Sequence, residues 1–549
     1  MSDEATMRFL PVGKEALLVE LADLSQTVAM FSDLQKNPIP GVWESVPAAK
    51  TILLRFTPNQ VSAVDLVNRI ATRRPGNDTR HNDVLVLIPV RYKGEDLEEV
   101  ARLLCMSTDE VIRRHCSTEW TVAFNGFAPG FGYLTGGDPC FRIPRRETPR
   151  TRVPAGAVAL AGNFSAVYPK ATPGGWQIIG ETDLTMWDLS RSPPALLQPG
   201  YRVRFVDADA NEIPVTETKK SPEVHYAGEV NPPEKTDPLI SHSGLSVVNT
   251  GLQSLFQDLG RHAQAVNGVS VSGALDRRAF RTANRLVGND VTEPALETVG
   301  GLVLQSHGDH VIAVTGAETA LKLVAPDGRS WPLSGYSPFA LSDGDRLHIG
   351  FPVRGARCYV ALRGGFSVDT VLGSASTDTL AHLGPAPLRS GQELHTGATH
   401  LTSVAFPELP PDNLPAAEDE VVLDIILGPR TDWFTKETPD LLQNQRWKVS
   451  PQSNRVGMRL TADQPVKRTI VDELPSEGVI PGSVQVPPSG QPVVFLADHP
   501  QTGGYPVVGC VASYHLDLAG QIPPGAMVRF NVIHSDKEYF PSLPERTAG

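Results

Sequence analysis

The sequence predicts a mainly β protein with α+β parts, and three observations support this fold class. The 549 residues include 48 glycines and 48 prolines without a collagen-like period, a composition typical of short strands joined by tight turns. A chain of this length exceeds what one hydrophobic core holds, so two to four domains are expected. From residue 244 onward, only one segment has a clear helical pattern.

The first part of the chain alternates strand and helix patterns. Apolar runs at residues 14–21, 50–56 and 83–92 predict strands, and residues 61–74 have helical spacing. Residues 94–116 predict two short helices, the second capped by Ser107 or Thr108, and strands with Gly/Pro turns follow. We therefore predict an N-terminal α/β subdomain at 1–90 and a β-rich domain at 91–216.

The second part begins after a proline-rich, aperiodic segment. Residues 217–243 predict a linker, whose length permits pairing of the halves within one chain or between two chains of a homo-oligomer. Residues 244–540 predict two β-rich subdomains, followed by a tail at 541–549. The helical pattern in this half starts after Ser272, which can cap it, and ends at Gly288.

Bulk composition excludes several classes of protein. A formal net charge of −12 without a basic stripe argues against nucleic acid as a partner. No segment is long and apolar enough to span a bilayer, and no signal sequence is evident. The 5 cysteines are scattered without a CxxC pair, which favours reduced thiols and a cytoplasmic location.

Two weakly similar segments suggest an internal duplication. Val153–Gly180 and Ile480–Gly509 both run from a Pro/Gly turn through a strand to a double glycine, an aromatic ring and a second strand. Repeats at this separation suggest duplicated domains that share one interface, although glycine-rich turns can also match by chance.

The segment "GFAPGFGYL", Gly126–Leu134, combines glycines that permit close approach with rigid apolar rings. One interpretation is a wall of a pocket where the two halves meet. On that interpretation, truncating Phe131 or Tyr133 lowers turnover and leaves folding unchanged. The other interpretation is a tight hairpin packed on its own domain.

Long motifs in both halves resemble known families. "IPVRYKGEDLEEVA", "GFAPGFGYL" and "VPAGAVALAGNFSAVYPKATPGGWQIIGET" resemble the KipI-like family, also called allophanate hydrolase subunit 1 or the B subunit of 5-oxoprolinase. "GLQSLFQDLGRHAQAVNGVSVSGALDRRAFRTANRLVGND", "YVALRGGFSVDTVLGSASTD", "SNRVGMRL" and "EGVIPGSVQVPPSGQPVVFLADHPQTGGYPVVG" resemble the KipA-like family, also called allophanate hydrolase subunit 2 or the C subunit of 5-oxoprolinase. The resemblance implies cyclophilin-like β-barrel domains in both halves, with the small α/β subdomain at the N-terminus.

The resemblance implies three functional contexts. The first is an ATP-dependent 5-oxoprolinase, which hydrolyses 5-oxo-L-proline to L-glutamate with a separate LamB/YcsF-type subunit. The second is the carboxyltransferase part of urea carboxylase, which uses carboxybiotin, and the third is regulation of a histidine kinase. The chain has no phosphate-loop motif, no biotin attachment site and no amidase serine loop, so ATP is implied by the family alone and biotin is not on this chain. These absences favour the first context.

The candidate site residues are polar and aromatic groups suited to a small planar amide. In the first half the predicted substrate-binding residues are Phe131, Tyr133, Arg150, Arg152, Tyr168, Lys170, Trp176 and Gln177. Arg is suited to carboxylates and Lys to a point charge, but the arginines also suit a basic turn paired to nearby acids.

In the second half the predicted catalytic residues are Asp498, His499, Asp258 and Arg261. Asp498 and adjacent His499 can form an acid–base pair if the chain turns at Pro500, and Asp258 and Arg261 place an acid and a base close together on one turn. The predicted substrate-binding residues there are Ser272, Asp276, Asn284, Arg455, Met458, Gln501, Thr502 and Tyr505. Asp276 and Ser272 can instead cap the helix, and Asn284 can tie the helix to a strand. No metal is expected, because His307 and His310 fit a polar turn between strands.

Overall fold

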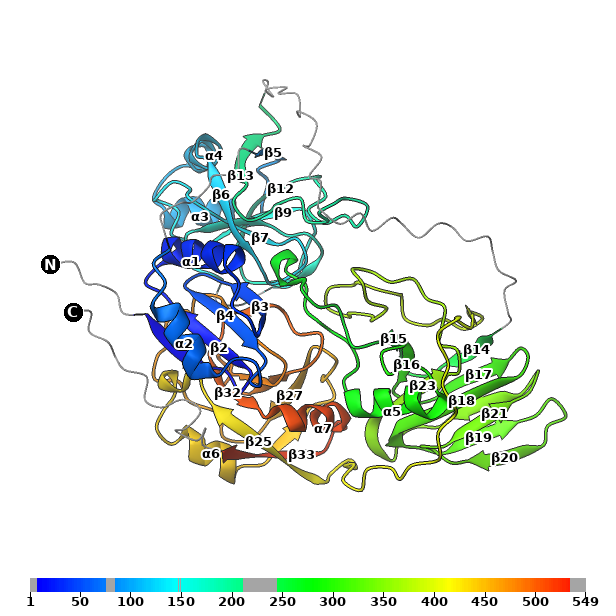
Figure 1. Ribbon diagram of the computed structural model, residues 1–549. Helices are drawn as coiled ribbons and strands as arrows, with labels where there is room; N and C mark the ends of the chain where they lie inside the picture. Colours follow the sequence, from blue (N-terminus) through cyan, green and yellow to red (C-terminus); the bar gives the residue numbers. More distant parts are fainter. Residues whose placement is uncertain (1–6, 76–83, 147, 149, 211–243, 534–549) are drawn as a thin grey trace.

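A computed structural model describes residues 7–75, 84–146, 148, 150–210 and 244–533 (Figure 1). The predicted linker and tail lie outside these residues. The described part is mainly β, with two barrels, a pair of sheets and a small α/β unit. Among these residues, no helix has the length and apolarity needed to cross a membrane.

The N-terminal unit is a four-stranded antiparallel sheet with two helices. Its strand order is β1 (Arg8–Pro11), β2 (Ala16–Glu20), β4 (Thr51–Phe56) and β3 (Val42–Pro47). The helices are α1 (Leu24–Lys36) and α2 (Ala63–Ala71). The side chains of Asp23 and Ser62 cap them by accepting a backbone N–H from the first turn of each helix. Three of these elements, β2, β4 and α2, fall in the predicted ranges 14–21, 50–56 and 61–74.

The first barrel is a seven-stranded sheet. Its order is β12 (Gln177–Glu181), β9 (Ala157–Ala161), β10 (Phe164–Val167), β7 (Gly132–Thr135), β6 (Trp120–Asn125), β13 (Arg202–Asp207) and β5 (Leu85–Val90). β5 pairs in parallel with β13, so it belongs to this sheet. The predicted boundary at residue 90 had placed this strand in the N-terminal unit instead. Helices α3 (Leu97–Leu103) and α4 (Thr108–Ser117) follow β5, and Ser107 caps α4 as predicted.

The next unit packs two sheets around an aliphatic core. One has the order β20 (Ser330–Leu333), β19 (Leu321–Val324), β22 (Arg346–Ile349), β17 (Leu302–Ser306), β14 (Leu245–Thr250) and β24 (Glu393–Leu394). The other has the order β15 (Ser254–Gln257), β16 (Ala295–Thr298), β23 (Arg354–Leu362), β18 (His310–Glu318) and β21 (Pro338–Leu341). Buried apolar residues of both sheets form one cluster, which includes Leu304, Val314 and Val360.

Helix α5 (Arg277–Val287) covers the five-stranded sheet, with Phe280 and Ala283 packed near Tyr359 of β23. The prediction that Ser272 caps this helix was wrong. The helix starts later, and the Asp276 carboxylate accepts one of the free N–H groups of the first turn, that of Ala279, at 2.8 Å. The helix ends at Gly288, which has φ of 77° as the glycine predicted.

The second barrel is closed. Its order is β25 (Glu420–Leu427), β32 (Val507–Val511), β29 (Ser483–Gln485), β30 (Val493–Phe495), β27 (Gly457–Thr461), β26 (Trp447–Val449) and β33 (Met527–Ile533). Helix α6 (Thr438–Asn444) lies between β25 and β26 in the chain, and α7 (Leu516–Gln521) precedes β33.

The two barrels have the same strand order. β12-β9-β10-β7-β6-β13-β5 corresponds to β32-β29-β30-β27-β26-β33-β25, with the last two strands parallel in both barrels. Each also has a two-stranded ribbon, β8 (Arg150–Val153) with β11 (Thr172–Gly174) and β28 (Glu477–Gly478) with β31 (Thr502–Gly503). The two similar sequence segments cover equivalent strands, so the expected barrel in each half is confirmed.

The N-terminal unit lies between the two barrels (Figure 1). Leu18 and Leu53 of its sheet join the apolar cluster that contains Phe495 and Val507 on the second barrel. Leu24 of α1 packs against the ring cluster of the first barrel. Each barrel therefore has its own apolar core and, in addition, an apolar face that is turned toward the middle of the molecule.

Candidate functional site

The segment Gly126–Leu134 forms the β6–β7 connection and most of β7. Phe131 and Tyr133 are 1% and 4% exposed, and the centroid of the Trp176 ring lies 5.4 and 5.5 Å from theirs. Tyr168 closes the cluster, with its ring centroid 5.2 Å from that of Phe131. These rings are buried side chains on the face of the first barrel that is turned toward the N-terminal unit and the middle of the molecule. The pocket-wall interpretation is therefore corrected in favour of close packing.

The three glycine-rich segments do meet where the halves join. The backbone N–H of Phe127 donates to the Thr502 hydroxyl at 3.0 Å, and the Tyr133 hydroxyl lies 3.4 Å from that of Ser476. Gln501 reaches from the same loop as Thr502 to the Val269 carbonyl. This side of the junction is filled by protein.

A cavity of about 310 Å³ lies on another side of the junction. One wall comes from the first half and the others from the second half. The lining residues are Ala171, Thr172, Pro173, Gln253, Thr379, Leu380, His382, Asn454, Arg455 and Val456. A cavity of this size, with mixed polar and apolar walls, suits a small polar molecule.

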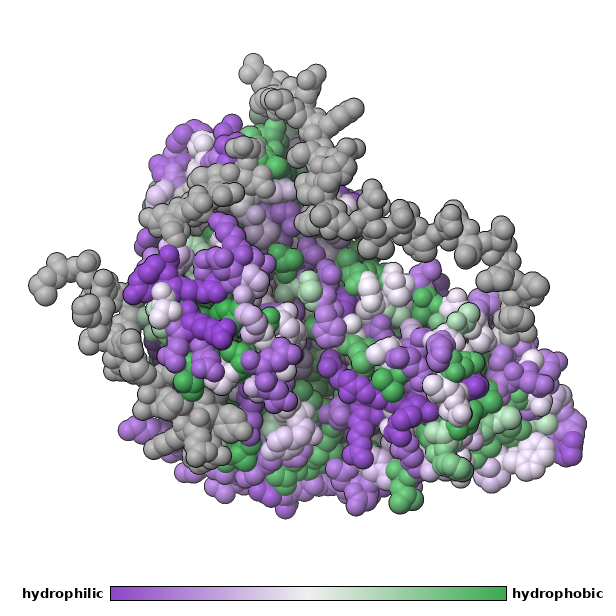
Figure 2. Space-filling view, viewed as in Figure 1, coloured by the Kyte–Doolittle hydropathy of each residue, from purple (hydrophilic) through white to green (hydrophobic). Residues whose placement is uncertain are grey.

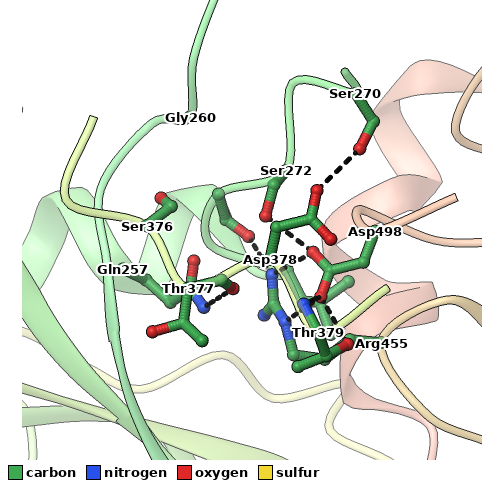
Figure 3. A network of polar contacts seen from close by, with 12 residues as sticks. Gln257, Gly260, Ser270, Ser272, Ser376, Thr377, Asp378, Thr379, Arg455 and Asp498 are labelled. Atoms are coloured by element: carbon green, nitrogen blue, oxygen red, sulfur yellow. Dashed lines mark hydrogen bonds and ion pairs between the residues drawn. The ribbon is translucent and has the colours of Figure 1, made fainter. Parts of the chain in front are cut away.

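A buried carboxylate holds two of the cavity walls in place (Figure 3). Asp498 accepts the Thr379 backbone N–H and hydroxyl at 2.8 and 2.7 Å, and Arg455 Nε and Nη2 at 3.0 and 2.9 Å. The Ser272 hydroxyl adds a bond of 2.6 Å. Burial alone would raise the pKa of Asp498, but Arg455 and these donors hold it below its ordinary value. Asp498 is therefore an ionised anchor and a weak base.

Arg455 connects three elements in this network. Its Nη1 donates to Glu297 of β16 at 2.5 Å, and its Nη2 donates to the Gly273 carbonyl at 2.6 Å. Because both carboxylates neutralise it, Arg455 serves chiefly to orient the wall. This differs from the predicted role of binding substrate directly.

Asp378 is a second buried carboxyl beside Asp498, and it was not among the residues predicted from the sequence. It accepts the backbone N–H groups of Leu380 and Ala381 at 3.0 and 2.8 Å. It also accepts the Ser270 hydroxyl at 3.0 Å (Figure 3). Burial, followed by the negative charge of Asp498, raises the pKa of Asp378 to about 7. Two neighbouring carboxyls with pKa values moved in opposite directions form an acid–base arrangement. The signal was the run "SASTD", where hydroxyl residues surround one acid.

Asp258 and Arg261 do not form the predicted acid–base pair with each other. Asp258 accepts the Ser374 hydroxyl at 2.7 Å and the Ala375 backbone N–H at 2.7 Å. Arg261 donates to the carbonyls of Val371 and Ser376. Both side chains therefore fix the loop that leads to Asp378. The Arg261 Nη1 group is buried, with no hydrogen-bond partner among the described residues.

His499 is also separate from Asp498. Its Nδ1 lies 2.7 Å from the Pro500 carbonyl, whereas the bonds of Asp498 go to Ser272, Thr379 and Arg455. Burial lowers the pKa of His499 to about 4, so the imidazole is neutral near pH 7. The predicted pairing of these adjacent residues was wrong, because their side chains serve different neighbours.

Lys170 of the first half reaches the loop behind the cavity. Its Nζ donates to the carbonyls of Ala381 and His382 at 3.2 and 3.4 Å. Burial lowers the pKa of this ammonium group. Of the first-half candidates, Lys170 is the one that crosses to the loop of Asp378.

The remaining candidates have structural contacts. Arg150 pairs with Asp96 and Glu95, which is the basic-turn alternative, and Arg152 is exposed. Other side chains contact backbone, ring or core groups: Gln177 donates to Pro144, Asn284 donates to Glu293, Tyr505 lies near Arg468, and Met458 is in the second barrel's core. These residues do not line the cavity.

The fold and the cavity define a protein of two equivalent barrels whose halves share a small polar site. Residues 7–197 match the model for carboxyltransferase domain, subdomain C and D, and residues 267–532 match that for subdomain A and B. The chain is 36% identical to the 5-oxoprolinase C subunit of Escherichia coli (strain K12), over 52% of this chain and 90% of that protein. It is 38% identical to the 5-oxoprolinase B subunit of Bacillus subtilis, over 32% of this chain and 78% of that protein.

The chain belongs to this carboxyltransferase-domain family, as a fused KipI-like and KipA-like protein. The family also includes urea amidolyase of Lachancea kluyveri, which is 31% identical over 52% of this chain but only 16% of its own length. The crystal structure of TTHA0988 superposes with a TM-score of 0.77 at 33% identity, over 94% of this chain and 99% of that one. The predicted family is confirmed, and its relatives are enzymes or enzyme subunits.

Proposed function

We propose that this chain is the fused B and C component of an ATP-dependent 5-oxoprolinase. It would hydrolyse 5-oxo-L-proline to L-glutamate in the cytoplasm, together with a separate LamB/YcsF-type subunit. One observation carries the proposal: a single chain is similar to two separate 5-oxoprolinase subunits, over 78% and 90% of their lengths. Fusion fixes their ratio and raises the effective concentration of each half for the other.

The cavity is the proposed substrate site. 5-Oxo-L-proline carries a lactam N–H, a carbonyl and a carboxylate, and the cavity is lined by the polar residues Thr172, Gln253 and Asn454. Opening the lactam requires water at its carbonyl and a proton for the departing nitrogen. Asp378 is our candidate for storing that proton behind the wall, because its pKa of about 7 keeps it partly protonated at neutral pH. Thr379, which lines the cavity, is the next residue in the chain.

A second candidate function is carboxyl transfer from carboxybiotin to urea or a related amide. The descriptions of both matching domains and the similarity to urea amidolyase support it. The biotin would then be delivered by another polypeptide. Urea also presents an amide N–H beside a carbonyl, so the same cavity serves both candidates.

Glutamate release distinguishes these functions. The purified chain is mixed with a LamB/YcsF-type subunit, ATP and 5-oxo-L-proline, and glutamate is measured with each component omitted in turn. We expect release only from the complete mixture. If glutamate does not form while a carboxybiotin donor yields carboxylated urea, the second function replaces the first.

A further inference from the structure

The two barrels place equivalent threonines at the junction. Thr172 is the first residue of β11 and pairs with Val153, the last residue of β8. Thr502 is the first residue of β31 and pairs with Gly478, the last residue of β28. The two ribbons follow the same pattern in barrels of the same strand order. Thr172 and Thr502 are therefore counterparts.

At Thr502 the junction is filled. The hydroxyl accepts the backbone N–H of Phe127, which lies in the β6–β7 connection of the opposite barrel. A Cβ added at neighbouring Gly126 would lie only 2.9 Å from the Thr502 hydroxyl oxygen, so the backbone is in close contact there. The partner of this hydroxyl is thus the N–H of an amide.

At Thr172 the junction is open. The residue is 8% exposed, and its hydroxyl oxygen is buried without a hydrogen-bond partner among the described residues. The cavity that it lines has Asn454, Arg455 and Val456 on another wall. These three residues belong to the β26–β27 connection, which is the counterpart of the β6–β7 connection. The same two elements therefore face each other, with a cavity in place of direct contact.

We infer that Thr172 is the anchor for a small amide. Rotation of the side chain about its Cα–Cβ bond turns the buried hydroxyl toward the cavity, where the amide N–H donates to it as the Phe127 N–H donates to Thr502. A buried hydroxyl without a partner costs free energy, which an amide ligand would offset by supplying the missing hydrogen bond. The identity of the amide rests on the proposed function: the lactam N–H of 5-oxo-L-proline, or an N–H of urea in the second candidate. The location of the anchor rests only on the duplicated geometry.

The test compares Thr172→Val with Thr502→Val, two isosteric changes at counterpart positions. Calorimetric titration with 5-oxo-L-proline, its N-methyl lactam and urea measures affinity, and thermal melting without ligand measures stability. Thr172→Val should weaken 5-oxo-L-proline binding about tenfold without lowering the melting temperature. The N-methyl lactam should bind the wild type no better than 5-oxo-L-proline binds Thr172→Val. Thr502→Val should instead lower the melting temperature, because the Phe127 N–H loses its acceptor, and should leave affinity within about twofold.

The outcomes separate this inference from the proposed function. Unchanged binding of 5-oxo-L-proline to Thr172→Val would overturn the anchor and leave the oxoprolinase function standing. Binding of urea alone, lost in Thr172→Val, would support the anchor and overturn that function. If neither compound binds the wild type, the anchor is rejected, while the glutamate assay still decides the function.

Discussion

The two barrels share one topology but join the rest of the molecule through different chemistry. The face of the first barrel that is turned toward the middle of the molecule is aromatic, with Phe131, Tyr133 and Trp176 in one ring cluster. The second barrel's corresponding face is mostly aliphatic around Phe495 and is covered by the N-terminal sheet. Strand order was therefore retained after duplication, while the surfaces that meet other units diverged.

The equivalent strand connections show the same divergence. The β6–β7 connection contacts the other half through its backbone, since the N–H groups of Phe127 and Gly130 donate to Thr502 and Asn267. The β26–β27 connection contacts it through the Arg455 side chain, which bonds to Glu297 and Gly273. A backbone contact fills its side of the junction, whereas a long side chain can hold the wall of a cavity. Figure 2 shows one face of the surface that encloses these buried contacts, with hydrophilic and hydrophobic areas interspersed.

The largest effect is expected for Phe131→Ala in the aromatic face. Phe131 is almost fully buried among four rings, so the truncation should reduce the free energy of unfolding by about 3–5 kcal/mol. Urea denaturation measures this loss. Leu252→Ala is the control, because Leu252 is 75% exposed and should change stability by less than about 0.5 kcal/mol. A normally folded Phe131→Ala protein without turnover would restore the pocket-wall interpretation.

Arg455→Lys tests the side-chain contact of the second barrel. Lysine keeps the charge but loses the planar fork that bonds Asp498, Glu297 and the Gly273 carbonyl together. We expect a loss of about 2–3 kcal/mol in the free energy of unfolding, together with weaker binding in the cavity. Arg459→Lys, on an exposed position of the same hairpin, is the matched control. Equal stability of the two variants would show that the fork does not hold the wall.

Much of the fold could be predicted from the sequence, because its signals are local. Ser107 before the second short helix and Gly288 after α5 mark ends that backbone chemistry requires, and both predictions were confirmed. Of the two caps that the sequence offered for α5, Asp276 was confirmed and Ser272 was not: the Asp276 carboxylate accepts the Ala279 N–H, whereas the Ser272 hydroxyl donates to Asp498.

The site was less predictable, because it depends on contacts between residues far apart in the chain. Asp498 was singled out from its motif, but its ionised state depends on Arg455, and its bond to Thr379 comes from another unit. Asp378 lies in the run "SASTD", but its raised pKa depends on burial and on the charge of Asp498, which the fold alone brings beside it. The rings of Gly126–Leu134 suit a pocket or a core equally well, and burial alone distinguishes these.

Asp378→Asn should change how stability depends on pH. The folded pKa of about 7 lies above the ordinary value of 3.8, so the folded state holds a proton that the unfolded state has released between these pH values. Stability from this group is therefore complete below about pH 4 and is lost as pH rises toward 7, with a slope of at most about 1.4 kcal/mol per pH unit. Asp498 raises the pKa of Asp378, and Arg261 lowers it.

Asparagine resembles the protonated acid, so the Asp378→Asn variant should lack this slope and should be more stable than the wild type at pH 8. Urea denaturation at pH 5, 6, 7 and 8 measures the difference. Asp309→Asn is a control outside this buried network. An unchanged slope in Asp378→Asn would mean that Asp378 is already ionised at pH 5.

The smallest effect is expected at the helices that follow the first strand of each barrel. In the first barrel the Ser107 hydroxyl accepts the Glu110 N–H at the start of α4, at 3.2 Å. In the second barrel Glu437 occupies the capping position of α6, but its side chain makes no capping bond. Ser107→Ala should therefore cost about 1 kcal/mol in the free energy of unfolding, and Glu437→Ala less than about 0.5 kcal/mol. Ser107→Asp, which restores an acceptor, should recover the loss. Equal costs at both helices would show that tertiary packing alone, and not the cap, fixes where α4 begins.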